Sequence, residues 1–358
     1  MTEKSAFSAI KGIQGGRVFF SANIPISKLK NLFEEDLPDE NERSQRDLDT
    51  RHSNAIARYI LSNQSSYIIG ALTFALDREP EFALSENSSG DFNQVGTLRL
   101  TNDIRISSLD GQHRREALLS AFYETESLKN ETVSIMLYVE PSVDNRRQMF
   151  SDMNSTSKKV SKAINILFDK RDPFAKAAKE LVKGHEMLID RVENFSGSIR
   201  GDSDKFFTLS GVKEALKNLE VGTSGRIKDP EMYTTDYLIQ QGCVLFDLLL
   251  QSRPEYREGM SSRENLLKLR ESSILFSSTT LRVIAGSIYK FKKLNEVTNI
   301  EPLKTSLAKR LSAIDFNKNS PIFIKAGFIK PESTTPQARN QEMTMASNVI
   351  FLELTSTD

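Results

Sequence analysis

The hydrophobic periodicity of the chain changes once, near residue 170, and this change restricts the folds open to it. Before that point, apolar runs typical of strands occupy residues 17–25, 67–77, 98–108 and 132–140 and alternate with helical patterns at 47–63 and 144–154. After it the pattern is almost wholly helical, with predicted helices at 172–189, 208–219, 233–251, 261–271 and 278–294. We therefore predict an α+β domain over residues 1–165 and a mainly helical domain over residues 166–358.

The segment 108-SLDGQHRREALLSAF-122 connects a predicted strand to a predicted helix. Asp110 is expected to cap the helix, and Gly111 allows a sharp turn and a close approach by a ligand. His113 and Arg114 then lie in the first helical turn, where unpaired amides and the helix dipole attract anions. A phosphate-binding turn and an ordinary Asp-Gly turn with solvated charges are both consistent with this pattern.

Other polar residues are candidates for the same site. Arg51 and Asn54, on one side of the helix at 47–63, could form a second wall. Asp152 and Asn154 are candidate ligands of a hydrated Mg²⁺, and Lys158 could reach a phosphate. The alternative for each is structural, as a helix cap or a surface charge.

Charge is balanced over the whole chain, with 48 basic and 48 acidic side chains, so any nucleic-acid binding needs a local patch. Residues 158–183 carry eight bases against three acids, whereas residues 31–50 carry eight acids against two bases. The two segments could pair within the molecule. The sharper hypothesis is a helix that contacts a DNA backbone, with candidate contacts at Lys158, Lys159, Lys162, Lys170 and Lys176.

Cys243 is the single cysteine, so an intramolecular disulfide and a zinc site of several thiolates are excluded. It lies in an apolar run and is interpreted as a small core residue. No apolar stretch reaches the roughly 18 residues that a membrane-spanning helix needs. We therefore expect a cytoplasmic protein without a membrane partner.

Residues 108–122, together with 150-FSDMNSTSKKVSKAINILFD-169, resemble the DGQHR-domain family from bacterial gene clusters for DNA phosphorothioation, a DNA sulfur modification. That family is similar to the ParB/sulfiredoxin fold, whose members bind nucleotide phosphates at the corresponding turn. The resemblance implies a nucleotide or phosphate site built from Arg51, Asn54, Asp110, Gly111, Gln112, His113, Arg114 and Asn154. Gln112 stands where sulfiredoxin has its reactive cysteine, which excludes sulfinic acid reduction by that route.

The function that the resemblance implies is a DNA-binding transcriptional regulator of such a gene cluster, part of a restriction-modification type of defence. Its expected partners are duplex DNA, a nucleotide (ATP or CTP with Mg²⁺) and other DNA sulfur-modification proteins. One alternative is a slow nucleoside triphosphatase, with Glu116 or Asp152 as the candidate catalytic residue that holds Mg²⁺, although no Walker-type phosphate loop is present. Another is an interaction module with an empty anion pocket. The oligomeric state is left open, and a homodimer is compatible with the sequence.

Overall fold

The computed structural model describes residues 3–33, 50–85, 94–156, 162–330 and 335–356. The chain forms two compact units, Met1–Lys158 and Lys159–Asp358, each described separately below. The boundary predicted after residue 165 falls inside helix α5 (Lys162–Phe168). This helix packs against α6 (Pro173–Gly184) and α7 (Leu209–Val221), so the whole of α5 belongs to the second unit.

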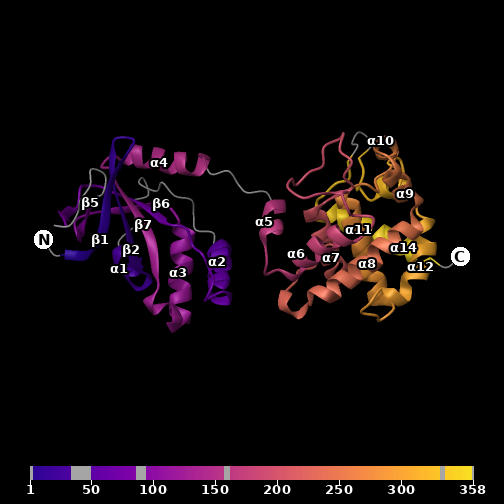
Figure 1. The fold of residues 1–358 in the computed structure, drawn as a ribbon, viewed down its shortest axis with the longest axis horizontal. Coiled ribbons are helices and arrows are strands. Elements are labelled where there is room, and N and C mark those ends of the chain that lie inside the picture. The colour runs from indigo at the N-terminus through magenta and orange to yellow at the C-terminus, as the bar shows by residue number, and fades with distance from the viewer. Residues whose placement is uncertain (1–2, 34–49, 86–93, 157–161, 331–334, 357–358) are drawn as a thin grey trace. The chain divides into compact units, whose positions relative to one another are not determined.

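A mixed seven-stranded sheet forms the centre of the first unit (Figure 1). Its strands are β1 (Glu3–Gln14), β2 (Arg17–Pro25), β3 (Leu72–Leu76), β4 (Glu81–Leu84), β5 (Gln94–Thr101), β6 (Ile106–Asp110) and β7 (Thr132–Val139). They lie in the order β4-β5-β1-β2-β7-β3-β6. The β3–β7 pair is parallel and the other neighbouring pairs are antiparallel. With the helices of the second unit, this sheet confirms the α+β class.

The sheet has to curl, because β5 and β6 are close in the chain but distant in the strand order. Five strand spacings separate them, which in a flat sheet amount to roughly 24 Å. The chain from Thr101 to Ile106 spans at most roughly 18 Å when fully extended. Curvature therefore brings the end of β5 toward the edge strand β6, which leads into the DGQHR turn.

The helices of the first unit are α1 (Leu29–Phe33), α2 (Thr50–Ser62), α3 (Gln112–Glu124) and α4 (Val143–Thr156), with 3₁₀ turns at Ile26–Lys28 and Glu126–Asn130. Helices α2 and α3 pack side by side (Figure 1). Their buried faces join the apolar side chains of the sheet in one core, through Ala57, Ile60, Ala117, Leu118 and Ala121. Burial of this helical stripe fixes α3, and therefore the turn that precedes it.

The sheet of the first unit differs from the sequence prediction at several strands. The strand predicted at 98–108 is two strands, because the chain turns after β5, where the Ile104 amide donates to the Thr101 carbonyl. The strand predicted at 67–77 begins only at Leu72, and Tyr67 instead donates its hydroxyl hydrogen to Glu131. Strands β1 and β4 were not predicted.

The second unit is a helical assembly with its own apolar core (Figure 1). Beyond α5, α6 and α7 it contains α8 (Thr235–Ser252), α9 (Pro254–Ser261), α10 (Arg263–Ser272), α11 (Ser278–Leu294), α12 (Lys304–Ser312), α13 (Pro321–Lys325) and α14 (Asn340–Thr355). Short 3₁₀ turns lie at Pro230–Met232 and Glu301–Leu303, and β8 (Val192–Glu193) pairs in parallel with β9 (Phe207–Thr208). Helix α11 packs against both α7 and α14, which explains why most of its residues are buried.

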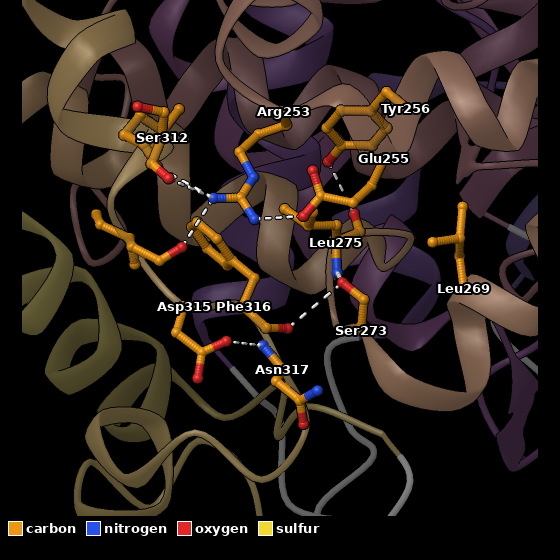
Figure 2. Close-up of polar contacts among 12 residues, drawn as sticks. Arg253, Glu255, Tyr256, Leu269, Ser273, Leu275, Ser312, Asp315, Phe316 and Asn317 are labelled. Atoms are coloured by element: carbon orange, nitrogen blue, oxygen red, sulfur yellow. Dashed lines mark hydrogen bonds and ion pairs between the residues drawn. The ribbon is translucent and has the colours of Figure 1, made fainter.

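A buried arginine holds the chain that follows α12 (Figure 2). Nη1 of Arg253 donates to the Leu311 carbonyl at 3.3 Å and to the Ile314 carbonyl at 2.8 Å, and Nη2 is paired with Glu255. The guanidinium also lies 4.9 Å from the ring centroid of Phe316. One side chain thus donates to carbonyl groups at the end of α12 and just beyond it, and the Leu311 carbonyl also accepts from the Ile314 amide.

We predict that Arg253→Met destabilises the second unit by about 3 kcal/mol, because it removes the charged donor from buried carbonyl oxygens and from the carboxylate of Glu255. Chemical denaturation followed by circular dichroism measures the change. Arg257→Met in α9, the helix that Arg253 precedes, is the matched control, since Arg257 is exposed and its contact with Glu186 is 3.9 Å long. Equal stability of the two variants would contradict the role given to Arg253.

Candidate functional site

Gly111 forms the turn between β6 and α3 in a conformation that favours glycine. Its φ is +94° and its ψ is 13°, in the left-handed region. A Cβ at this position would lie 2.7 Å from Cδ2 of Leu72 and 3.3 Å from the Leu72 Cα. Both the backbone angle and the packing against β3 therefore require a residue without a side chain.

Among the described residues, no side chain caps the N-terminus of α3. Gly111 is the N-cap residue, and its carbonyl accepts from the Arg115 amide at 2.8 Å. The prediction that Asp110 caps this helix is wrong, because the left-handed turn at Gly111 separates Asp110 from the first-turn amides. The amides of Gln112, His113 and Arg114 lie at the positions where a helix leaves its N–H groups without intrahelical acceptors.

Arg114 binds to the two segments that flank the turn. Its Nη2 is 2.6 Å from Oδ2 of Asp110, and its Nη1 donates to the Ala71 carbonyl at 3.1 Å. A Cβ on Gly70 would lie 2.7 Å from the same Nη1, so the loop before β3 makes room for the guanidinium. The arginine side chain keeps a quarter of its surface exposed.

Carboxylates balance the two neighbouring arginines of the first helical turn. Asp110 pairs with Arg114, and Glu116 pairs with Arg115 at 2.8 Å. These pairs relieve the unfavourable placement of positive charge at a helix N-terminus. An anion that binds here has to compete with Asp110 for Arg114.

His113 contacts α2, which forms a second wall beside the turn. Its Nδ1 is 3.2 Å from Oγ of Ser53, and its ring meets the ring of His52 edge-on with centroids 5.2 Å apart. The predicted residues Arg51 and Asn54 are exposed on the same helix.

Ser53 and His52 were not predicted from the sequence. Two of the three histidines of the chain lie at the starts of α2 and α3, and this was the signal that could have shown the contact.

Asp152 and Asn154 lie on α4, which packs beside β6. Both are exposed and make contacts within their own helix: Asp152 accepts from Gln148 at 2.7 Å, and Asn154 donates to the Phe150 carbonyl at 2.7 Å. In the described part of the chain, no group of three or more His, Cys, Asp or Glu side chains is arranged to hold a metal ion.

The start of α4 is held by Glu140. Its carboxylate accepts from Arg17 at 2.9 Å, from the Asn145 side chain at 3.1 Å and from the Ser142 amide at 3.1 Å. Burial by itself would raise the pKa of Glu140, but these hydrogen bonds and the charge of Arg17 hold that pKa below its usual value. Glu140 is therefore a structural anchor rather than a proton donor.

Of the lysines predicted to contact DNA, Lys158 and Lys159 lie outside the described residues. Lys162 is the first residue of α5. Lys170 lies between α5 and α6, Lys176 lies on α6, and both are exposed. Lys179 has a structural role, since its Nζ donates to the carbonyls of Leu167 (3.2 Å) and Asp169 at the end of α5. Lys170 and Lys176 are therefore exposed enough to contact a ligand.

Comparison with known families gives one result across both units. A family model, DndB, described as DNA-sulfur modification-associated, matches residues 7–355. No curated protein and no solved structure matches the chain. The likeness to the ParB/sulfiredoxin fold therefore stays a prediction. None of the helices in the described ranges has the length and apolar character needed to cross a membrane.

We predict that Gly111→Ala destabilises the first unit by about 2 kcal/mol or more, through the left-handed backbone and the contact with Leu72. Gly16→Ala is the control, because Gly16 also has a positive φ (+75°) but open space where the Cβ would lie. Thermal unfolding of both variants separates backbone strain from packing. A Gly111 variant no less stable than the Gly16 variant would contradict the packing argument.

Proposed function

The chain belongs to the DndB family of DNA-sulfur modification-associated proteins, and from this membership we propose that it is a DNA-binding regulator of a DNA phosphorothioation gene cluster. In this proposal the start of α3 binds the phosphates of a nucleotide, ATP or CTP with Mg²⁺, and occupancy of that site changes the affinity for DNA. Family membership ties the protein to DNA sulfur modification and to the machinery that performs it. The nucleotide and the regulatory role are our inference.

The observation that carries the nucleotide site is the uncapped N-terminus of α3. Free first-turn amides and the positive end of the helix dipole attract an anion. The left-handed glycine lets a phosphate approach the backbone without meeting a Cβ. The Arg114 guanidinium beside it can donate two parallel hydrogen bonds to phosphate oxygens.

The ion pair between Asp110 and Arg114 gives this site a built-in competitor. Without ligand the carboxylate occupies Nη2, and a phosphate has to displace it. Repulsion between Asp110 and the phosphate weakens binding unless the carboxylate moves away or a cation such as Mg²⁺ lies between them. Asp110 is the last residue of the edge strand β6. If it moves when a ligand binds, the end of this strand moves with it.

Hydrolysis is not part of this proposal. Glu116 is held by Arg115, and Asp152 accepts from Gln148, so neither candidate acid is directed to the turn by a contact that would favour catalysis. Binding without rapid turnover is the function that the geometry supports better.

We expect calorimetric titration with ATP and with CTP, in the presence of Mg²⁺, to detect binding to the wild-type chain. Arg114→Ala should weaken it by about tenfold or more, since it removes a charge-assisted contact to phosphate. Asp110→Asn should tighten it, because the competing carboxylate is lost. Asp144→Asn is the control for the change in net charge, as Asp144 is exposed on α4. If Asp110→Asn and Asp144→Asn behave alike, the competition model fails.

For DNA, the replacement of Lys170 and Lys176 together by Gln should weaken binding to a duplex from the gene-cluster promoter. The slope of log K against log salt should also fall by about 2, one contact for each lysine. Fluorescence anisotropy at several salt concentrations, with and without nucleotide, measures both effects. Lys268→Gln with Lys325→Gln is the control, since these lysines are also exposed in the second unit. An unchanged salt slope would remove Lys170 and Lys176 from the DNA interface.

A further inference from the structure

The second unit contains a cavity of about 370 Å³ that the proposed function does not use. This volume is within the range of small-molecule sites in proteins. The end of α7, the 3₁₀ turn at Pro230–Met232, the start of α8, the end of α11 and the segment that follows α11 surround it. Its lining residues include Glu220, Tyr233, Tyr237, Tyr289, Lys292 and Lys293.

A buried ion pair provides the polar part of the cavity. Nζ of Lys292 is 3.1 Å from Oε1 of Glu220, and the two side chains are 5% and 9% exposed. The Tyr237 hydroxyl lies 3.2 Å from Oε2 of Glu220 and 3.0 Å from the Thr298 carbonyl. Burial raises the pKa of Glu220 and lowers the pKa of Lys292, while their mutual attraction opposes both shifts. The pair offers a donor and an acceptor close together without a net charge.

Three tyrosines line the cavity, and two of their hydroxyl groups are unused. Within the described part of the chain, the hydroxyls of Tyr233 and Tyr289 make no hydrogen bond, whereas that of Tyr237 does. Tyr233 packs its ring against Phe174 with centroids 5.1 Å apart, which holds the ring in place. Burial is the main cause that raises the pKa of Tyr233, and the nearby Glu220 and Tyr289 raise it further. The hydroxyl of Tyr233 therefore stays protonated. A ligand here therefore meets aromatic rings and two available hydroxyl groups.

Lys293 places a positive charge beside these rings. Its ammonium group lies 5.9 Å from the ring centroid of Tyr289, the residue is exposed, and no ion pair engages it among the described residues. Met232, which is 79% exposed, adds a flexible apolar contact. The side of the cavity next to Lys293 therefore favours an anionic group.

These features together exclude two simpler ligands. A cationic amine would find the carboxylate of Glu220 already neutralised by Lys292 and would be repelled by Lys293. A wholly apolar ligand would shield the ion pair and the tyrosine hydroxyls from water and would offer them no hydrogen bond in return. A planar heteroaromatic ring with hydrogen-bonding edges and an attached anion satisfies all the groups.

We propose that this cavity binds a nucleotide unit, with the base between the tyrosine rings and its phosphate near Lys293. Aromatic side chains bind bases by stacking regardless of sequence, and a base edge presents adjacent donors and acceptors to the Glu220–Lys292 pair. The nucleotide unit has two possible sources, a free mononucleotide or a single-stranded segment of DNA. This site lies in the second unit and does not rest on the function proposed for the turn at Gly111.

Calorimetric titration of the full chain with the four deoxynucleoside monophosphates, and separately with single-stranded decamers, tests the proposal. We expect at least one probe to bind. Tyr289→Ala should weaken this binding by about tenfold, the change expected for one lost stacking contact, and Lys293→Gln should weaken it as well. Binding by monophosphates identifies a free nucleotide as the source, and binding by decamers alone identifies a DNA strand. Deoxyribose 5-phosphate, which lacks the base, should not compete.

Three controls keep the outcomes distinct. Tyr289→Phe retains the ring, so it should bind better than Tyr289→Ala, and circular dichroism shows whether each variant is folded. Lys268→Gln, an equal change of charge on α10, should leave binding unchanged. The same titrations are repeated in an Arg114→Ala background, so that binding at the site proposed for α3 does not contribute to the signal. No binding by any probe to the wild-type chain, or full binding by a folded Lys293→Gln and Tyr289→Ala, would overturn the proposal.

Discussion

The guanidinium of Arg114 joins three segments of the first unit: the end of β6, the start of α3 and the loop that leads into β3. It does so through the Asp110 carboxylate and the Ala71 carbonyl. Because Gly111 lies in the left-handed region beside Leu72, the chain passes from β6 into α3 within one residue, and Arg114 can pair with Asp110. The DGQHR turn is therefore both a structural junction and the place where backbone amides are left open. A ligand that takes Arg114 from Asp110 would act directly on that junction.

The second unit uses buried charge in another way. Arg253 donates to carbonyls at the end of α12 and just beyond it, and the Glu220–Lys292 pair joins the ends of α7 and α11. The first arrangement is covered by Phe316 and holds the chain, whereas the second borders a cavity lined by three tyrosines. Buried ion pairs contribute little to stability by themselves, because desolvation offsets their attraction. Here the contacts of Arg253 fix the position of the chain, and the Glu220–Lys292 pair fixes the polar groups that a ligand would meet.

Much of the site was predictable, but its internal contacts were not. The strand-turn-helix order around Gly111 followed from local patterns, since an Asp-Gly pair between an apolar run and a helical stripe indicates such a turn. The partner of Asp110 was predicted wrongly, as a helix amide instead of Arg114, because that choice depends on the sign of one φ angle. The contact of His113 with Ser53 joins residues 60 apart in the chain, and periodicity carries no information about such pairs.

By itself the sequence determined the division into a strand-rich half and a helical half, the position of the glycine turn and the resemblance that the family match then supported. These are local properties, set by hydrophobic spacing and by residues with restricted backbone angles. The tertiary structure alone decided the strand order, with β5 and β6 separated in the sheet although nearly adjacent in the chain. It also decided that Glu220, Tyr237 and Lys292 meet at one cavity. Such arrangements depend on which faces pack together, and this is settled only when the entire core is buried.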